Sequence, residues 1–522
     1  MSIAVVNFLD EKLLKHIIKR GFSKIQYLKK SAIIDVNLFN DIEFIDGSNF
    51  TKIHWDLYND LFSQLEKIST ELPSFFEYKG INLKDAVLKD LLWECLNDYC
   101  VTHAKKISNR DEDYLIIDTP PSKLFFLVKI ILKWLKSLIY LPSKALNINS
   151  ESIKNKILVN ANNKTKIDLF KDVYRILGGQ KITIISTEGQ GDFKSYANQN
   201  YDVKYFSINP RRTRSLSLLK QLRCLPLVNI ELLYKIFSVR NNLCEYVATY
   251  EKLFSMNPYA IIDIAGENNG KGTIISLIGK KYDVISFNYM NGAKAKEPYN
   301  LGTCFDYWFM PDEETKNMLM SYTMLDENQL PVIGHMNEDR MMNFIPKNLL
   351  AQFKSNYLDK KIITVYSSPL FRDEFYEVIN TINKEIDSDK YIVFVKYHPL
   401  DETTLKNIPS YFVQLPLDED ITKNVMFLYE LYYYSHVNIS FTSTVCKEAS
   451  LFKGTSINYE CREISELPFV SSIKDIIHVK NKNHLKIILD DLLNDKTPLE
   501  HGIKVVPTQL VAERMANFIL KR

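Results

Sequence analysis

A lysine, a histidine and a proline follow one of the apolar runs in the second half of the chain. The run YIVFVKYHP places Lys396, His398 and Pro399 at the end of a predicted strand. Because parallel sheets bind ligands at the carboxyl ends of their strands, these side chains are expected at a binding edge. His398 can donate a hydrogen bond to a phosphate oxygen and stabilise charge on a departing nucleotide, while Pro399 stiffens the turn. A purely structural histidine in a turn is the alternative.

Hydroxyl side chains gather in a second segment further along the chain. The strand-like run HVNISF is followed by Thr442, Ser443 and Thr444, and then by the helix-forming segment VCKEASLF. Hydroxyls at a helix start cap the helix, and with free backbone N–H groups they also bind phosphate. Glu448 lies four residues after Thr444 on the same helical face, where a carboxylate can accept hydrogen bonds from ribose hydroxyls. Capping alone accounts for the hydroxyls, but two polar motifs that each follow a strand favour a nucleotide site.

Transfer of a group to a hydroxyl needs a base, and two carboxylates are placed for that role. The segment ITIISTEGQGD presents Glu188 in a glycine-containing loop after a strand, and AIIDIAGENNGKG presents Glu267 in another. Each can take a proton from an acceptor hydroxyl, and Glu188 is ranked above Glu267. An ordinary solvated loop carboxylate is the alternative for both residues.

Two other kinds of site are disfavoured by the spacing of residues. The segment GENNGKG lacks the GxxxxGK[ST] pattern of a phosphate-binding loop, which argues against an ATPase. No Asp-x-Asp sequence stands at a strand end, and a site of His, Ser and Thr can stabilise a leaving phosphate without a cation. We therefore expect no essential metal and no cofactor beyond a nucleotide-sugar substrate.

Apolar strands alternate with helical segments around these residues. From about Lys156 the chain runs through strand-like segments at KILVNAN and ITIIST, separated by the helix-period segment IDLFKDVYRIL. Further strands are predicted at Lys204–Ile208, Ala260–Ala265, Asp283–Asn288 and Tyr307–Met310. After a break around Gly334–Lys347, a second series begins with KKIITVYSS. The predicted fold is α/β, with two Rossmann-like lobes facing a cleft, one over 151–340 and one over 341–522.

Residues 1–150 are predicted to form an accessory α/β region. They mix a helix-like stretch at Leu83–Lys105 with strand-like runs at Ala32–Val36 and Tyr114–Ile117. No motif in them points to a chemistry.

One segment of this region, Leu124–Leu141, is long and apolar but carries lysines at intervals. Lys129, Lys133 and Lys136 follow one another at steps that put all three on one helical face. Such a stripe suits a helix lying in the interface of an anionic membrane. An amphipathic helix packed on the protein's own core is the alternative.

Composition limits the class of protein. The 522 residues exceed what one hydrophobic core normally serves, so two or three domains are expected. The balance of 66 Lys+Arg against 63 Asp+Glu is too even to indicate a nucleic-acid partner. Seven cysteines lack the spacing of a zinc site or disulfide framework, and the start MSIAVVNFLDEKLLKH does not resemble an export signal. These features favour reduced thiols in a cytoplasm.

The two polar motifs together resemble the donor lobe of a known enzyme group. KYHP followed by FTSTVCKEASLFKGTSINY, within Lys360–Glu460, is similar to GT-B glycosyltransferases that use CMP-linked acidic sugars, such as bacterial sialyltransferases and polysialyltransferases. The resemblance implies that His398, Ser443 and Thr444 contact the CMP moiety. It also implies a base in an Asp/Glu-Gly loop, to which Glu188-Gly189 is similar, although one acidic position of the fuller pattern is missing. The implied activity is inverting transfer of a sialic-type sugar onto a bacterial surface glycan, at the inner face of the cytoplasmic membrane.

Other classes of protein share the expected layout. CDP-glycerol and CDP-ribitol phosphotransferases usually carry a His-Gly pair after a strand of the first lobe, where this chain has Asn291-Gly292. A nucleotide-sugar 2-epimerase needs no acceptor, and a non-catalytic scaffold for glycan assembly needs no donor. These alternatives stay open.

Overall fold

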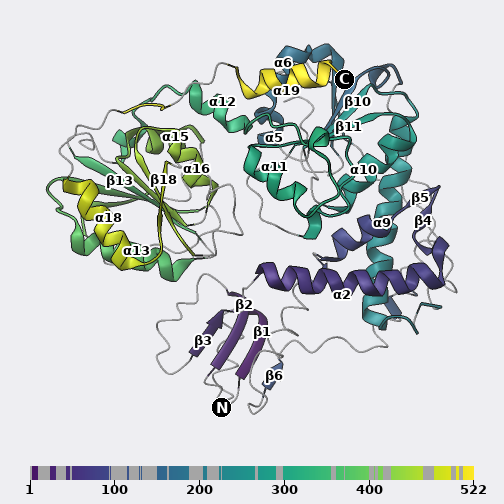
Figure 1. Cartoon of the computed structure of the whole chain (residues 1–522), viewed down its shortest axis with the longest axis horizontal. Helices are drawn as coiled ribbons and strands as arrows, with labels where there is room; N and C mark the ends of the chain where they lie inside the picture. The colour runs from purple at the N-terminus through teal and green to yellow at the C-terminus, as the bar shows by residue number, and fades with distance from the viewer. Residues whose placement is uncertain are drawn as a thin grey trace.

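The computed structural model describes the chain in segments. They comprise residues 3–9, 24–30, 43–46, 50–92, 94–95, 114–116, 128–129, 131, 150–161, 164–186, 204–207, 223–224, 226–264, 269–289, 298–353, 360–368, 371–398, 405, 409–415, 425–441, 443–461, 475–494, 501–504 and 509–522. Two six-stranded sheets and one four-stranded sheet are built from them, together with a two-stranded hairpin. Figure 1 shows the two larger sheets in separate lobes and the small sheet next to the N-terminus.

The first lobe contains a parallel sheet in the strand order β12-β11-β10-β7-β8-β9. Its strands are β7 (Ile157–Asn160), β8 (Ile182–Ser186), β9 (Lys204–Ser207), β10 (Ala260–Asp263), β11 (Ile285–Tyr289) and β12 (Tyr307–Phe309). Every residue of β7, β8 and β10 is buried, as expected for central strands covered on both faces. The order is that of dinucleotide-binding folds, whose ligands lie where the strand order reverses, here between β7 and β10.

The second lobe repeats this arrangement with a new set of strands. They are β13 (Lys361–Tyr366), β14 (Tyr391–Lys396), β15 (Phe412–Leu415), β16 (Val437–Phe441), β17 (Thr455–Tyr459) and β18 (Ile476–Val479). The order is β15-β14-β13-β16-β17-β18, again all parallel, with the reversal between β13 and β16. The predicted α/β class with two Rossmann-like lobes, GT-B-like in layout, is confirmed.

Helices cover the sheets. In the first lobe and its exit they are α5 (Lys164–Leu169), α6 (Lys171–Leu177), α9 (Ile230–Phe254), α10 (Gly270–Lys281), α11 (Glu313–Met320) and α12 (Met336–Met342). In the second lobe they are α13 (Arg372–Glu385), α15 (Val425–Tyr434), α16 (Thr444–Ser450) and α18 (Lys482–Asn494). Several begin at a capping side chain; Asn229 accepts from Leu232 N before α9, for example. No described helix is long and apolar enough to cross a membrane.

The N-terminal region contains a sheet that was not foreseen. Strands β1 (Ile3–Leu9), β2 (Lys24–Lys30), β3 (Glu43–Asp46) and β6 (Tyr114–Ile116) pair in parallel in the order β3-β2-β1-β6. Lysines at both ends of β2 obscured its strand pattern. The predicted strand at Tyr114–Ile117 is present as β6, the predicted strand at Ala32–Val36 lies outside the described residues, and the predicted helix at Leu83–Lys105 is described over 84–92 and 94–95.

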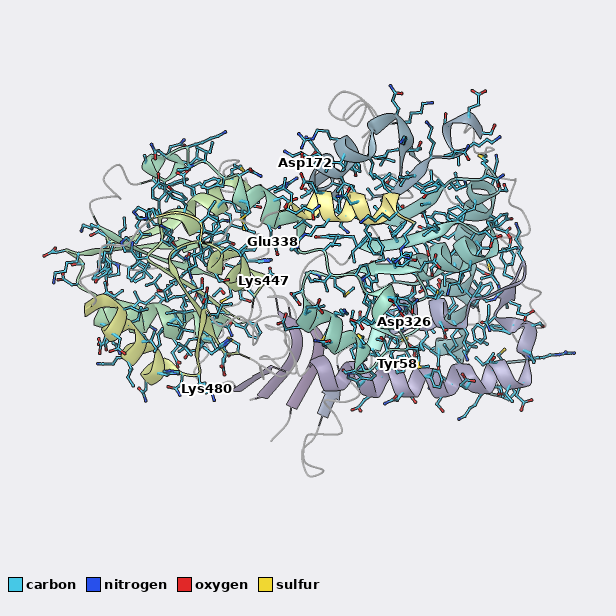
Figure 2. The ribbon with its side chains drawn as sticks, turned by 45° about the horizontal axis from the view of Figure 1, so that its top comes forward. Tyr58, Asp172, Asp326, Glu338, Lys447 and Lys480 are labelled. Atoms are coloured by element: carbon cyan, nitrogen blue, oxygen red, sulfur yellow. The ribbon has the colours of Figure 1, made fainter. Side chains whose placement is uncertain are left out.

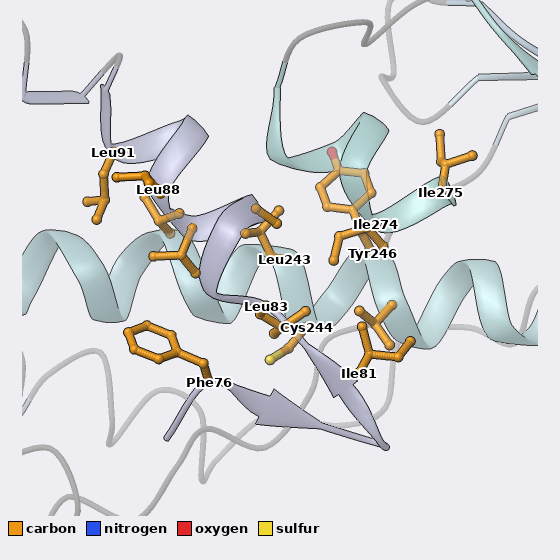
Figure 3. Packing of buried hydrophobic residues seen from close by; sticks show 14 of the residues in the cluster. Phe76, Ile81, Leu83, Leu88, Leu91, Leu243, Cys244, Tyr246, Ile274 and Ile275 are labelled. Carbon is orange, nitrogen blue, oxygen red and sulfur yellow. The ribbon is translucent and has the colours of Figure 1, made fainter. Parts of the chain in front are cut away.

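Part of the N-terminal region shares a hydrophobic core with the first lobe. Helix α2 (Phe50–Glu71), the hairpin β4 (Glu77–Tyr78) and β5 (Ile81–Asn82), and the helix at 84–92 pack against α9 and α10. Figure 3 shows Phe76, Leu83 and Leu88 beside Leu243 and Cys244 of α9. The domain boundaries at 150 and 340 remain a prediction. The structure adds that residues on both sides of position 150 share one hydrophobic core.

The last helix of the chain returns to the first lobe. Helix α19 (Val511–Leu520) lies beside α6, as Figure 1 shows near the C-terminus, and also contacts α12. Met515 and Ile519 join the core formed by Ile157 and Ile262 of the first sheet. The chain therefore enters the second lobe after α12 and leaves it before α19.

A buried carboxylate fixes this return. Asp339 of α12 accepts hydrogen bonds from Val511 N at 2.7 Å and Ala512 N at 2.8 Å, capping α19 from another helix. Burial raises the pKa of the Asp339 carboxyl more than the two backbone donors lower it. Removal of the Asp339 carboxylate would leave these two backbone N–H groups without an acceptor.

We expect Asp339→Ala to lower the free energy of unfolding by about 2 kcal/mol, because a cap with two buried bonds is lost. Urea denaturation followed by circular dichroism measures this value. Asp326→Ala is the matched control, because Asp326 caps a short turn through Asn328 N and Gln329 N in an exposed position. Equal losses in both variants would contradict the role of Asp339.

Candidate functional site

A pocket lies between the two lobes. The first lobe and its exit line it with Pro311, Asp312, His335, Glu338 and Met341, and α16 of the second lobe lines it with Thr444, Lys447, Glu448 and Leu451. Asp312 follows β12 and Thr444 follows β16, so the pocket is formed at the carboxyl ends of strands from both sheets. Figure 2 shows Glu338 and Lys447 near each other between the lobes.

An ion pair crosses the pocket. Lys447 Nζ lies 2.6 Å from Asp312 Oδ2, and the two side chains are only 19% and 17% exposed. The other oxygen of Asp312 accepts from Thr315 N at 2.7 Å and caps α11. Burial alone would raise the pKa of Asp312, but Lys447 and Thr315 outweigh it and hold that pKa below its usual value. Asp312 is therefore an ionised carboxylate at neutral pH, with both oxygens engaged.

Glu448 makes a second contact between the lobes, in addition to the ion pair of Lys447 with Asp312. Its Oε2 accepts from the Tyr432 hydroxyl at 3.1 Å, and its Oε1 accepts from Asn337 Nδ2 at 3.2 Å. Burial raises the pKa of this carboxyl above its usual value, and the two donors only partly oppose it. Glu448 lines the pocket as a binding residue should, and each oxygen keeps a further lone pair for a ligand hydroxyl. Its predicted contact with ribose stays a prediction.

His335 precedes α12 and takes part in its cap. Its Nδ1 accepts from Asn337 N at 3.3 Å, while its backbone N donates to Glu338 Oε1 at 3.2 Å. Burial, supported by the charge of Lys447 and opposed by Asp312, lowers the pKa of His335 to about 4. The imidazole is therefore neutral at pH 7. Burial also raises the pKa of Glu338.

The predicted hydroxyl motif lies at the start of α16. Ser443 is the N-cap, and its side chain accepts from Val445 N at 3.3 Å, so the capping role is confirmed. Thr444, the first helical residue, lines the pocket. Thr442 lies outside the described residues. A nucleotide-binding role for these hydroxyls stays a prediction.

The predicted histidine motif lies at the same edge of the second sheet. Lys396 ends β14 and donates to Tyr397 O at 3.1 Å, and burial lowers its pKa. His398 is exposed, and its backbone N donates to Ser367 Oγ at 2.9 Å, just after β13. Because β14 and β16 flank β13, the two motifs end at one edge around the strand reversal. His398 does not line the interlobe pocket, and Pro399 lies outside the described residues.

The two proposed bases lie outside the described residues. Glu188 follows β8 in the chain and Glu267 follows β10, and these strands are separated by β7 alone. Near the same reversal, Asn160 Nδ2 donates to Asp263 Oδ1 at 2.8 Å in a fully buried pair. This pair joins the last residues of β7 and β10.

Four ionisable residues of the pocket were not foreseen from the sequence: Asp312, His335, Glu338 and Lys447. Asp312 follows the predicted strand Tyr307–Met310 by two residues, so the rule that led to His398 also pointed to it. His335 and Glu338 lie in the break between the two lobes, which was treated only as a boundary. Lys447 stands beside Glu448 and was passed over.

Within the described residues, no group of three or more His, Cys, Asp or Glu side chains is placed to hold a metal ion.

Of the segment Leu124–Leu141, only residues 128, 129 and 131 are described. Lys129 Nζ lies 5.9 Å from the ring centroid of Tyr234 on α9, a contact with the protein's own helix. Lys133 and Lys136 lie outside the described residues.

Comparison with known proteins gives structural similarities alone. No family model and no curated protein matches the sequence. The chain is similar to UDP-GlcNAc 2-epimerase from Methanocaldococcus jannaschii, with a TM-score of 0.46 and 14% identity over 70% of this chain and 100% of that one. It is also similar to UDP-GlcNAc 2-epimerase from Neisseria meningitidis bound to UDP-GlcNAc, with a TM-score of 0.43 and 12% identity over 70% of this chain and 100% of that one. A third similar structure is the wall teichoic acid polymerase TagF, with a TM-score of 0.39 and 12% identity over 76% of this chain and 96% of that one.

The fold and the pocket define a class: two-lobed α/β proteins whose candidate site lies between two Rossmann-like lobes. This class is established by the strand order of the two sheets and not by the similarities above.

Proposed function

We propose that this chain is an inverting, metal-independent glycosyltransferase that moves a sugar from a nucleotide donor onto a bacterial surface glycan. The donor is most consistent with a CMP-linked acidic sugar of the sialic type. The second lobe binds the nucleotide through His398, Ser443 and Thr444, and the first lobe supplies the base, Glu188 or Glu267. The enzyme works in the cytoplasm, in peripheral contact with the inner membrane face through Leu124–Leu141.

One observation carries the proposal: two nucleotide-binding strand orders are joined by a pocket at their carboxyl edges. A direct displacement needs the donor and the acceptor held on opposite sides of a cleft, with charge stabilisation on one side and a base on the other. His398 and Ser443 stand after strands of the second sheet, and both carboxylate candidates follow strands of the first sheet. The 2-epimerase shares the layout but needs no acceptor hydroxyl, whereas a polyol phosphotransferase needs one as well.

A donor screen tests the proposal. The full chain is mixed with CMP-, CDP-, UDP- and GDP-linked donors, and thermal shift and nucleotide release are recorded with and without glycan acceptors. Acceptor-dependent release of CMP is the expected result. Release of CMP from CDP-glycerol or CDP-ribitol would instead favour a polyol phosphotransferase. Isomerisation without an acceptor would favour a 2-epimerase, and glycan binding with no donor binding would favour a scaffold.

With the donor identified, we expect His398→Ala to lower turnover about 100-fold, because a hydrogen bond to the leaving phosphate is lost as charge develops there. Steady-state rates at saturating donor measure this loss. His484→Ala, at the start of α18 after the edge strand β18 and separated by β17 from the strand reversal, is the control and should keep the wild-type rate. A folded His398→Ala protein with full turnover would remove His398 from the site.

A further inference from the structure

The proposed donor carries negative charge that the protein has to meet. A CMP-linked acidic sugar is anionic at its phosphate and at its carboxylate. A site that works without a metal ion must balance this charge with groups of the protein. The hydroxyls of Ser443 and Thr444 are neutral, so a cationic side chain is needed beside them. Lys447 is such a side chain, because it lies on the same helix and lines the same pocket as Thr444.

The position of Lys447 on α16 suits this role. It follows Ser443 by four residues and Thr444 by three, so the three side chains share one face of the helix. Helical side chains lean toward the N-terminal end of their helix, and lysine has a flexible four-carbon stem. The ammonium group of Lys447 can therefore reach a phosphate that these two hydroxyls bind.

A carboxylate of the protein holds this ammonium group in the described structure. Lys447 Nζ lies 2.6 Å from Asp312 Oδ2. Within the part of the chain that the structure describes, no second acceptor lies within hydrogen-bonding distance of Nζ. The pocket around the pair is too narrow for a nucleotide, so the ion pair has to open before Lys447 can contact one. Asp312 thus occupies the position that an anionic ligand group would take.

Asp312 differs from the two other carboxyl groups of the pocket. Burial opposes the ionisation of all three, and it prevails for Glu338 and Glu448, whose pKa values are raised. For Asp312, Lys447 and Thr315 outweigh burial, and the pKa stays below its usual value. Asp312 is therefore the ionised partner of Lys447. It belongs to the first lobe and Lys447 to the second, so their ion pair also joins the lobes.

We propose that Lys447 binds the phosphate of the donor, and that Asp312 competes with this phosphate for the ammonium group. The proposal rests on the function proposed above, to which it adds a binding residue and an autoinhibitory contact between the lobes. The donor exchanges one charge-assisted contact of Lys447 for another, so no proton has to be gained or lost. The ion pair lowers the apparent affinity for the donor, because only molecules in which it is open can bind.

Two substitutions and their combination test this competition. In Asp312→Asn, the amide oxygen can still accept from Thr315 N, while the amide NH2 faces Lys447 and cannot hold it. We expect Asp312→Asn to bind CMP about tenfold more tightly than wild type, because no ion pair has to break. We expect Lys447→Met to bind CMP about tenfold more weakly, because a charge-assisted contact to phosphate is lost. The double variant should bind like Lys447→Met, since Asp312 acts only through Lys447.

Calorimetric titration of the full chain with CMP and with inorganic pyrophosphate measures these affinities, and urea denaturation checks that each variant is folded. Glu385→Gln is the matched control and should bind as wild type does. It releases Lys486 from an ion pair at 3.0 Å between α13 and α18, which cover the other face of the second sheet from α16. The double variant leaves no unpaired charge, so it stays informative if Lys447→Met alone fails to fold.

Two results would overturn the proposal. Unchanged or weaker binding in Asp312→Asn would exclude the competition. Wild-type affinity in folded Lys447→Met, or equal affinities of the double variant and Asp312→Asn, would exclude the contact of Lys447 with phosphate.

Failure of the proposed function gives a different pattern. If CMP binds to wild type without the expected order of affinities among the variants, only the role of the ion pair is wrong. If no nucleotide binds but inorganic pyrophosphate shows the expected order, the proposed function fails and the anion site at Lys447 stands. If neither CMP nor pyrophosphate binds to wild type or to Asp312→Asn, both proposals fail.

Discussion

Gly454→Ala is expected to destabilise the second lobe by about 3 kcal/mol or more, the largest stability effect predicted for a single methyl group in this chain. Gly454 is buried just before β17, and an added Cβ would overlap the backbone oxygen of Ser435 and press on Asn438 Nδ2. Neither backbone can move away easily. Ser435 N donates to Leu431 O at 3.0 Å at the end of α15, and Thr455 N donates to His436 O at 2.9 Å.

Urea denaturation with fluorescence and circular dichroism measures the effect without any substrate. Gly80→Ala is the matched control: its Cβ would meet no atom within 4 Å, although its φ of +74° adds moderate strain. We expect the control to lose about 1 kcal/mol. Equal losses in both variants would mean that the close approach of Gly454 to Ser435 tolerates a methyl group.

Glu188→Gln is expected to lower sugar transfer by a factor of about 10² to 10⁴ while donor affinity stays nearly unchanged, because the amide keeps the size of the side chain but cannot take a proton. The expectation depends on chain topology. Glu188 follows β8, next to the central strand β7, so its loop leaves the carboxyl edge where the first sheet meets the interlobe site. In the proposed reaction, an acceptor hydroxyl approaches this edge to attack a donor bound by the second lobe.

Glu267→Gln is the companion variant, because Glu267 follows β10 on the other side of β7. We expect a mild effect, and single-turnover rates with saturating donor separate the chemical step from binding. The reverse pattern would move the base to Glu267. Two near-normal variants would exclude both carboxylates as the base.

The sequence predicted the strands of the two lobes well because central parallel strands are continuous apolar runs. Segments such as Ala260–Asp263 and Tyr391–Lys396 match their predicted positions within two residues. The edge strands β9 and β12 of the first lobe were predicted, whereas β15 and β18 of the second lobe were missed, because their two central residues are only half-buried and do not form a continuous apolar run. Of the N-terminal sheet, β6 was predicted, whereas β2 and β3 were missed because they carry lysines and acidic residues.

The candidate site was predicted only where local rules apply. A strand end followed by polar residues is visible in one segment, so His398, Ser443, Thr444 and Glu448 were singled out, and of these Thr444 and Glu448 line the pocket. The ion pair of Asp312 with Lys447 joins residues 135 positions apart. No spacing rule connects such residues, since their contact depends on how one lobe docks against the other. The neutral state of His335 was equally hidden, because it follows from burial.

The return of α19 to the first lobe has a consequence for synthesis of the protein. The core around Ile157 receives Met515 and Ile519 from the last turns of the chain. A ribosome makes the first lobe early, yet that lobe lacks part of its core until α19 has left the exit tunnel. The second lobe carries all of its own strands by Val479 and can fold sooner. The half of the protein that is translated first is thus expected to be the last to complete its packing.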